Sequence, residues 1–69
     1  MTPEYAYSLG RKAFYGDKFR VAVFDGAILA YVSRSEKKPT DDDSPILDAW
    51  LRGWDAANIE AMMEVKNGR

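Results

Sequence analysis

The chain has 69 residues, of which 46% are hydrophobic and 30% are charged. This length allows a single domain over residues 1–69 with one small core, and the apolar content is too high for intrinsic disorder. Ten basic and eleven acidic residues give a net charge of −1, whereas proteins that bind phosphate backbones usually carry a basic excess, so nucleic acid is disfavoured as a partner.

The first element with a clear pattern is a helix, which we predict over residues 3–15. Thr2 supplies a hydroxyl cap, Pro3 needs no amide partner at the first helical position, and Glu4 places a negative charge at the positive end of the helix dipole. Apolar and small residues then recur at spacings of three and four until Gly16, a natural C-terminal stop.

Residues 19–32 change to β-branched and aromatic types, which predicts a β-hairpin. Asp25 and Gly26 form the dipeptide that suits a two-residue type I′ turn. In that register one face of the hairpin is wholly apolar and should be core: Phe19, Val21, Val23, Ile28, Ala30 and Val32. A helical interpretation of residues 20–33 stays open, because the periodicity of short apolar runs is ambiguous.

The second face of the hairpin is too apolar for a face in water and is predicted to be a contact surface. Arg20 and Tyr31 would form a cross-strand cation–π pair at its rim. Aromatic anchors beside an arginine are typical of the centres of protein interfaces. The predicted partner-binding residues are Arg20, Phe24, Leu29 and Tyr31, with Lys37 and Lys38 of the following loop steering the encounter. Packing of this face on the chain's own helices or on a second copy is the open alternative.

Residues 34–43 are charged and lack an apolar period, so they are predicted to form an exposed loop. A long second helix is predicted over residues 45–66. Ser44 and Pro45 repeat the cap-and-proline pattern of a helix start, and the three aspartates at 41–43 favour a helix N-terminus.

The second helix has more apolar surface than one helix and one hairpin can cover. One stripe, with spacings of three and four, indicates packing on another helix: Leu47, Trp50, Trp54, Ala57 and Ala61. Further apolar residues lie outside this stripe: Leu51, Ile59, Met62 and Met63. We therefore expect a homodimer.

The predicted fold class is α+β, with two antiparallel helices packed on the apolar face of the hairpin.

The side chains that most enzymes use are missing from the sequence. It contains no histidine and no cysteine, which removes the commonest general base, the commonest metal ligand and the strongest nucleophile. The adjacent aspartates at 41–43 do not follow the spacing of a calcium loop and are typical of solvated charge. We expect a non-enzymatic protein without cofactor or metal. Without a disulfide framework, a secretion signal or a membrane span, a cytoplasmic location fits best.

Two short blocks of small residues and tryptophans occur in the two predicted helices. The first is G-x-x-A-x-x-G, starting at Gly10, and the second is AW-x-x-GW-x-A-A over residues 49–57. Small residues let two helices approach closely while tryptophans fill the space beside them. The blocks therefore predict a helix pair built on Gly10, Ala13, Trp50, Gly53, Trp54 and Ala57.

This pair of blocks resembles the ribosome modulation factor family and its small phage-borne relatives. The phage-borne relatives imply a protein that binds and inhibits a host protein directly, in the manner of anti-CRISPR proteins or anti-activators of quorum-sensing transcription regulators. We take this inhibitor as the leading hypothesis. The family's own activity implies the alternative, a ribosome-associated hibernation factor that binds ribosomal RNA. Two departures from the family are the long segment between the helices and the slightly acidic net charge.

Overall fold

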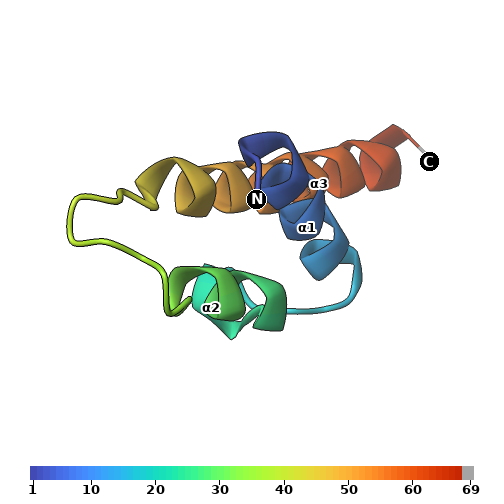
Figure 1. Ribbon diagram of the computed structural model, residues 1–69. Coiled ribbons are helices and arrows are strands. Elements are labelled where there is room, and N and C mark those ends of the chain that lie inside the picture. Colours follow the sequence, from blue (N-terminus) through green and yellow to red (C-terminus); the bar gives the residue numbers. More distant parts are fainter. Residues whose placement is uncertain (68–69) are drawn as a thin grey trace.

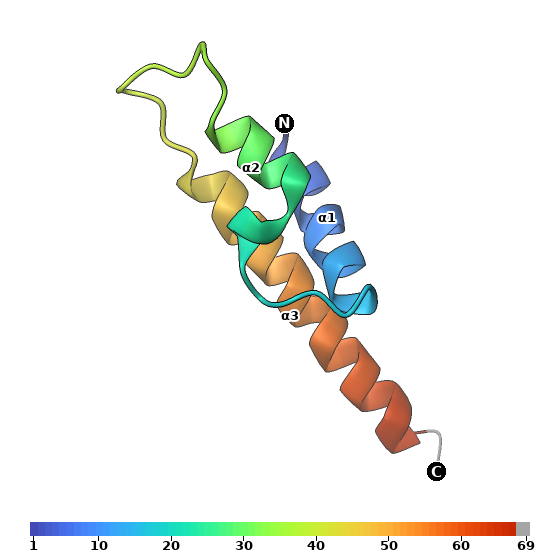
Figure 2. The same cartoon turned by 90° about the horizontal axis from the view of Figure 1, so that it is seen from below.

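The computed structural model describes residues 1–67, which form three α-helices and one 3-10 turn. In chain order these are α1 (Pro3–Tyr15), η1 (Ala22–Phe24), α2 (Gly26–Val32) and α3 (Ser44–Asn67). The short helix α2 and the turn η1 lie together on one side of α3, and α1 packs beside them on α3 (Figures 1 and 2). The fold is therefore a small helical one in which a single long helix is the platform.

The two long helices lie where the sequence predicts them. The hydroxyl of Thr2 accepts a hydrogen bond of 3.1 Å from the Tyr5 amide and caps α1. The helix α3 begins at Ser44, one residue before the predicted start, because the carbonyl of Asp43 accepts the first helical hydrogen bonds, from Ile46 and Leu47. Local capping signals therefore defined both starts to within one residue.

The predicted β-hairpin over residues 19–32 is wrong, and with it the α+β fold class. Residues 1–67 contain no strand, and this segment forms η1 and α2 instead. Neither Asp25 nor Gly26 has the positive φ that a type I′ turn requires. The Asp25 carboxylate accepts a hydrogen bond of 3.0 Å from the Ala27 amide and caps α2. Aspartate is as strong a helix cap as a turn residue, and here it starts a helix.

The small core lies between α1 and α3 and is closed by α2. Its buried hydrophobic residues are Ala6, Ala13, Ala22, Ile28, Ile46, Trp50 and Ala57. Of the predicted apolar hairpin face, only Ile28 is buried. Phe19, Val21 and Val23 are exposed, since they lie in the connection before α2 rather than on a strand. The core assignment of that face failed along with the hairpin.

Glycines at the crossing bring the backbones of α1 and α3 into direct contact. A Cβ atom added at Gly10 would overlap the carbonyl of Trp50, and one added at Gly53 would overlap the carbonyl of Tyr7. The contact is reciprocal, since each helix presents a glycine to a carbonyl of the other, as in Cα–H···O contacts between closely packed helices. The small residues of the two sequence blocks therefore lie at the helix crossing.

The predicted antiparallel arrangement of the long helices is wrong, because α1 and α3 run in the same direction (Figure 2). Near its start, α1 meets α3 at Tyr7 and Gly53. At its end, the Tyr15 hydroxyl donates a 2.7 Å hydrogen bond to Glu60, further along α3. A hairpin between the helices would have reversed the chain three times and left α3 antiparallel to α1. The single helix α2 reverses the chain only twice, so α3 runs parallel to α1.

The end of α1 has the Schellman geometry, with a left-handed residue one position later than the sequence indicated. Gly16 ends the helix with φ of −92°, and Asp17 takes a φ of 60°. The Lys18 amide then donates to the Ala13 carbonyl at 2.9 Å and the Asp17 amide to the Phe14 carbonyl at 3.1 Å. This turn directs the chain across α3 toward η1.

Candidate protein-binding surface

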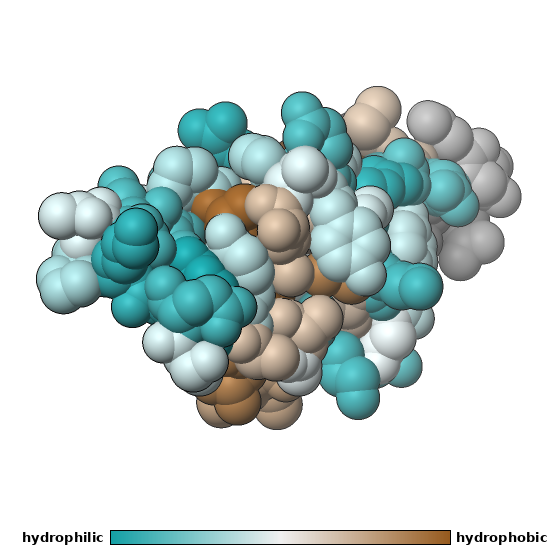
Figure 3. Space-filling view, viewed as in Figure 1, coloured by the Kyte–Doolittle hydropathy of each residue, from teal (hydrophilic) through white to brown (hydrophobic). Residues whose placement is uncertain are grey.

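The connection between α1 and α2, residues 17–25, carries the most exposed large apolar side chains. Phe19 is 75% exposed and Phe24 is 73% exposed, and Val21 and Val23 are exposed beside them. Figure 3 shows hydrophobic residues gathered over the part of the molecule formed by α2 and η1, while hydrophilic residues cover the 34–43 loop. We call the four exposed residues Phe19, Val21, Val23 and Phe24 the apolar edge.

Three polar anchors hold the 17–25 segment against α3. The indole N–H of Trp54 donates to the Lys18 carbonyl at 3.1 Å. The guanidinium of Arg20 makes a two-pronged contact with the Asp55 carboxylate, at 2.7 and 2.8 Å, and this hydrogen bonding lowers the pKa of Asp55. The indole N–H of Trp50 donates to the Asp25 carboxylate at 3.0 Å. The backbone of the segment is thus fixed while its apolar side chains face outward.

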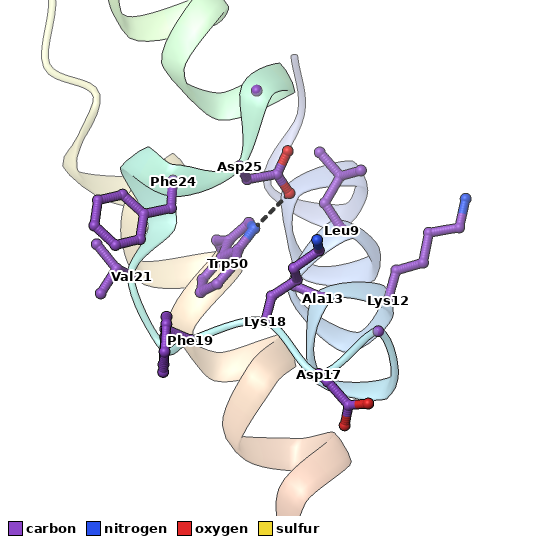
Figure 4. Close-up of a pocket in the computed structure, with 12 residues that line it drawn as sticks. Leu9, Lys12, Ala13, Asp17, Lys18, Phe19, Val21, Phe24, Asp25 and Trp50 are labelled. Carbon is purple, nitrogen blue, oxygen red and sulfur yellow. Dashed lines mark hydrogen bonds between the residues drawn. The ribbon is translucent and has the colours of Figure 1, made fainter.

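An apolar groove of about 620 Å³ lies between α1 and the 17–25 segment. Leu9 and Ala13 line it on the α1 side, and Phe19, Val21 and Phe24 line the opposite side, with Trp50 between them (Figure 4). Trp50 is only 1% exposed and forms the floor. This volume lies within the range of about 300–1,000 Å³ that is usual for ligand sites.

Two lysines stand at the rim of the apolar groove. Lys12 comes from α1 and Lys18 from the turn that follows it (Figure 4). No ion pair joins either ammonium group to a carboxylate among residues 1–67. The one carboxylate beside the floor, that of Asp25, is occupied by the Ala27 amide and by Trp50. Asp17, in the same turn as Lys18, also lines the groove (Figure 4). The groove is therefore apolar inside, and its edge carries charges of both signs.

The residues that the sequence assigned to partner binding do not form one surface. Phe24 lies on the apolar edge, and Leu29 is exposed on α2. Tyr31 is half-buried and packs on the core. The predicted cation–π pair of Arg20 with Tyr31 is wrong, because Arg20 binds Asp55 and it is Arg34 whose guanidinium lies 4.0 Å from the centre of the Tyr31 ring.

The 34–43 loop is held by a cluster of ion pairs. Asp43 is only 7% exposed, and its carboxylate lies 2.9 Å from the Lys37 ammonium and 3.3 Å from the Arg34 guanidinium. The hydrogen bond from Lys37, together with Arg34, lowers the pKa of Asp43. Lys38 uses its backbone amide to bind Asp41 at 3.0 Å. Lys37 is therefore engaged within the loop, and its ammonium is not free to attract a partner as the sequence predicted.

A second polar cluster joins the end of α1 to α3. The Glu60 carboxylate accepts from the Tyr15 hydroxyl at 2.7 Å and from the Arg11 guanidinium at 2.8 Å. The Tyr15 hydrogen bond is the main reason that the pKa of Glu60 is lowered, and the same bond raises the pKa of Tyr15. These hydrogen bonds connect the two helices and so stabilise the fold.

Among residues 1–67 there is no group of three or more carboxylates placed to hold a metal ion.

Sequence reasoning missed Leu9, Lys12, Lys18, Phe19 and Val21 as parts of one site. They come from α1, from the turn after it and from the irregular segment before α2. Because these residues differ in type and lie in separate segments, they produce no hydrophobic periodicity in the sequence. The available signal was the run of large apolar residues from Phe19 to Phe24, which contains only Arg20 as a polar residue and which we interpreted as a strand.

In comparisons with known proteins, no family model, curated protein or solved structure matches the chain. The resemblance to the ribosome modulation factor family thus remains a prediction based on the two short blocks. No helix within residues 1–67 is long and apolar enough to cross a membrane.

Proposed function

We propose that this chain is a non-enzymatic protein that binds a host protein and inhibits it by covering a surface of that protein. The observation that carries the proposal is the apolar groove, flanked by two phenylalanines that are about three-quarters exposed. Contiguous exposed aromatic side chains usually mark an interaction surface, and aromatic anchors dominate the energetics of protein interfaces.

The groove favours one kind of occupant, an amphipathic helix of the partner. Its floor at Trp50 and its walls at Leu9 and Phe24 would take large apolar side chains from one face of such a helix. Lys12 and Lys18 at the rim would pair with acidic residues that flank those apolar side chains, and Asp17 with a basic one. The expected recognition element is therefore a helix with apolar residues three or four positions apart and neighbouring charged residues of both signs.

Binding of ribosomal RNA, the alternative function, has less support from the arrangement of charges. Arg11, Arg20, Arg34 and Lys37 each hold a carboxylate of the chain itself at 3.6 Å or less. Phosphate binding by these residues would have to break those ion pairs. A basic stripe free for phosphates is the usual electrostatic footprint of a nucleic-acid surface.

The sequence resemblance to small phage-borne relatives of the ribosome modulation factor family supports a place of action and a class of target for this inhibitor. A phage-borne inhibitor would act in the cytoplasm of the bacterial host. A regulator of transcription, such as a quorum-sensing activator, is an example of the class of target. Such a target would be inactivated when the groove takes up a helix that it needs for its own contacts.

Affinity capture from a nuclease-treated bacterial lysate tests this proposal when it is combined with surface variants. We expect a captured protein to be lost with Phe24→Asp, which places a charge on the apolar edge. It should be retained with the matched control Leu29→Asp, which changes an exposed apolar residue of α2 outside the groove. Capture that is unchanged by Phe24→Asp would refute the groove as the binding site. Ribosomal proteins that are captured from an untreated lysate and lost on nuclease treatment or added salt would favour the hibernation factor instead.

A further inference from the structure

The last turns of α3 extend beyond the rest of the molecule (Figure 2). The last polar clasp between α1 and α3 is at Glu60, where Arg11 and Tyr15 bind it. The molecule measures 51 Å along its longest axis but only 17 and 14 Å along the others. Its radius of gyration is 13.6 Å, whereas a compact domain of this length would have ~11 Å. A long piece of helix therefore lacks cover from its own chain.

Three large apolar side chains stand on this projecting part of α3. Ile59 is 57% exposed, Met62 is 64% exposed and Met63 is 57% exposed. Residues three and four positions apart lie on the same side of a helix, so the three side chains form a single face, which we call the tail face. Leu51, which the sequence grouped with them, is half-buried against the core and does not belong to the tail face.

The acidic residues of the same turns lie away from the tail face. Glu60 is turned toward α1, where it binds Arg11 and Tyr15. Glu64 follows it four residues later, which places it on that same side of the helix. Two copies of the tail face could thus meet without bringing carboxylates together. Methionine side chains are flexible and pack well against copies of themselves.

We infer that a second copy of this chain covers the tail face, with the two α3 helices side by side and antiparallel about a two-fold axis. A two-fold axis places the same patch on both partners, which requires a self-complementary surface such as this one. An antiparallel pair also sets the helix dipoles in opposite directions. Six side chains that are each more than half exposed form a patch smaller than the ~1,000 Å² of a stable specific interface. The dimer should therefore be a weak one that exchanges with the monomer as the concentration changes.

The tail face and the apolar groove lie on different parts of the molecule. Within the described part of α3, Trp50 is the only residue that lines the groove, and it precedes the tail face by more than two turns. The dimer would therefore leave both grooves open. Its existence does not depend on the proposed function, and each can fail without the other.

Sedimentation equilibrium of the full chain over the micromolar range tests the inference. We expect the mass to rise from 7.8 kDa toward twice that value as the concentration increases. Met62→Lys should keep the monomer mass throughout, because two ammonium groups would meet at the two-fold axis. The matched control Leu29→Lys, at another exposed apolar position, should associate as the wild type does.

Charge complementation makes the test independent of folding defects. Met62→Lys and Met62→Glu should each be monomeric, with wild-type helicity by circular dichroism, and an equimolar mixture should recover the dimer mass. A wild-type chain that stays monomeric, a Met62→Lys variant that associates normally or a mixture that stays monomeric would each overturn the inference. Loss of association in Leu29→Lys would also overturn it, by placing the interface elsewhere.

Discussion

Replacing Gly53 with alanine gives the sharpest test of how this fold is held together. Alanine is favoured over glycine inside a helix by about 1 kcal/mol, so an uncrowded site would gain stability. At Gly53, however, the added methyl would overlap the Tyr7 carbonyl, and the same holds for Gly10 and the Trp50 carbonyl. Because both obstacles are backbone atoms, no side chain can rotate aside to make room. The helices must separate along their contact.

The expected loss can be estimated from the cost of overpacking. Insertion of a methyl group into a filled space costs about 1–3 kcal/mol when neighbours can adjust, and more when they cannot. After the gain in helix propensity, we expect Gly53→Ala to lower the free energy of unfolding by about 2 kcal/mol. A chain of this length has a total stability of only about 3–10 kcal/mol. The melting temperature should therefore fall by about 8–16 °C.

Thermal and urea unfolding followed by circular dichroism at 222 nm would measure this loss. Gly26→Ala is the matched control, because nothing lies within 4 Å of an added Cβ and the residue begins α2 without a positive φ. We expect this control to be neutral or slightly stabilising. If Gly10→Ala and Gly53→Ala were as stable as Gly26→Ala, the close contact of α1 with α3 would be refuted.

Three further predictions concern the turn after α1, the groove floor and the ion-pair cluster. Asp17→Gly should raise the melting temperature by about 2–6 °C, since glycine adopts the left-handed φ of 60° without the strain that aspartate bears; a fall would contradict the Schellman geometry. Trp50→Phe should lower the free energy of unfolding in urea by about 2–3 kcal/mol, because it leaves a cavity and breaks the hydrogen bond to Asp25. A loss below about 1 kcal/mol would contradict the role of Trp50 as the groove floor. The pKa of Asp43 is lowered in the folded state by Lys37 first and Arg34 second, so its contribution to stability is complete above the unfolded pKa of about 4 and is lost as the pH falls below that value through the lower folded pKa. Asp43→Asn should accordingly flatten the pH dependence of the melting temperature in that window, and an unchanged slope would contradict the assignment.

The sequence predicted those parts of the fold that local signals determine. The N-cap Thr2, the Ser44-Pro45 helix-start pattern and the helical periodicity located both long helices to within one residue. The small residues Gly10 and Gly53 also identified the helix crossing, since glycine weakens a helix interior and a close contact between helices is one reason to keep it there. These features depend on neighbours a few residues away along the chain or on a steric property of one residue type.

The middle of the chain could not be predicted, because its local signals support two structures equally. The apolar run and the Asp25-Gly26 dipeptide fit a hairpin as well as a capped helix. A contact across 25 residues favours the helix, since the same carboxylate that caps α2 also accepts the Trp50 indole N–H. Long-range contacts of this kind leave no trace in the periodicity of a sequence. The groove shares this property, because its walls come from separate segments.

The close helix crossing also explains why the apolar edge is exposed. Gly10, Ala6 and Gly53 bring the backbones of α1 and α3 so near at the crossing that no aromatic ring fits at that point. The buried space is then filled by one large side chain, Trp50, and by Ile28 from α2. Phe19 and Phe24 have no remaining interior to enter, so the segment that carries them must leave them at the surface. Because such exposure is unfavourable in water, we expect these two side chains to be retained for binding rather than for folding. Their replacement by polar residues should then leave the melting temperature almost unchanged while it abolishes capture of the partner.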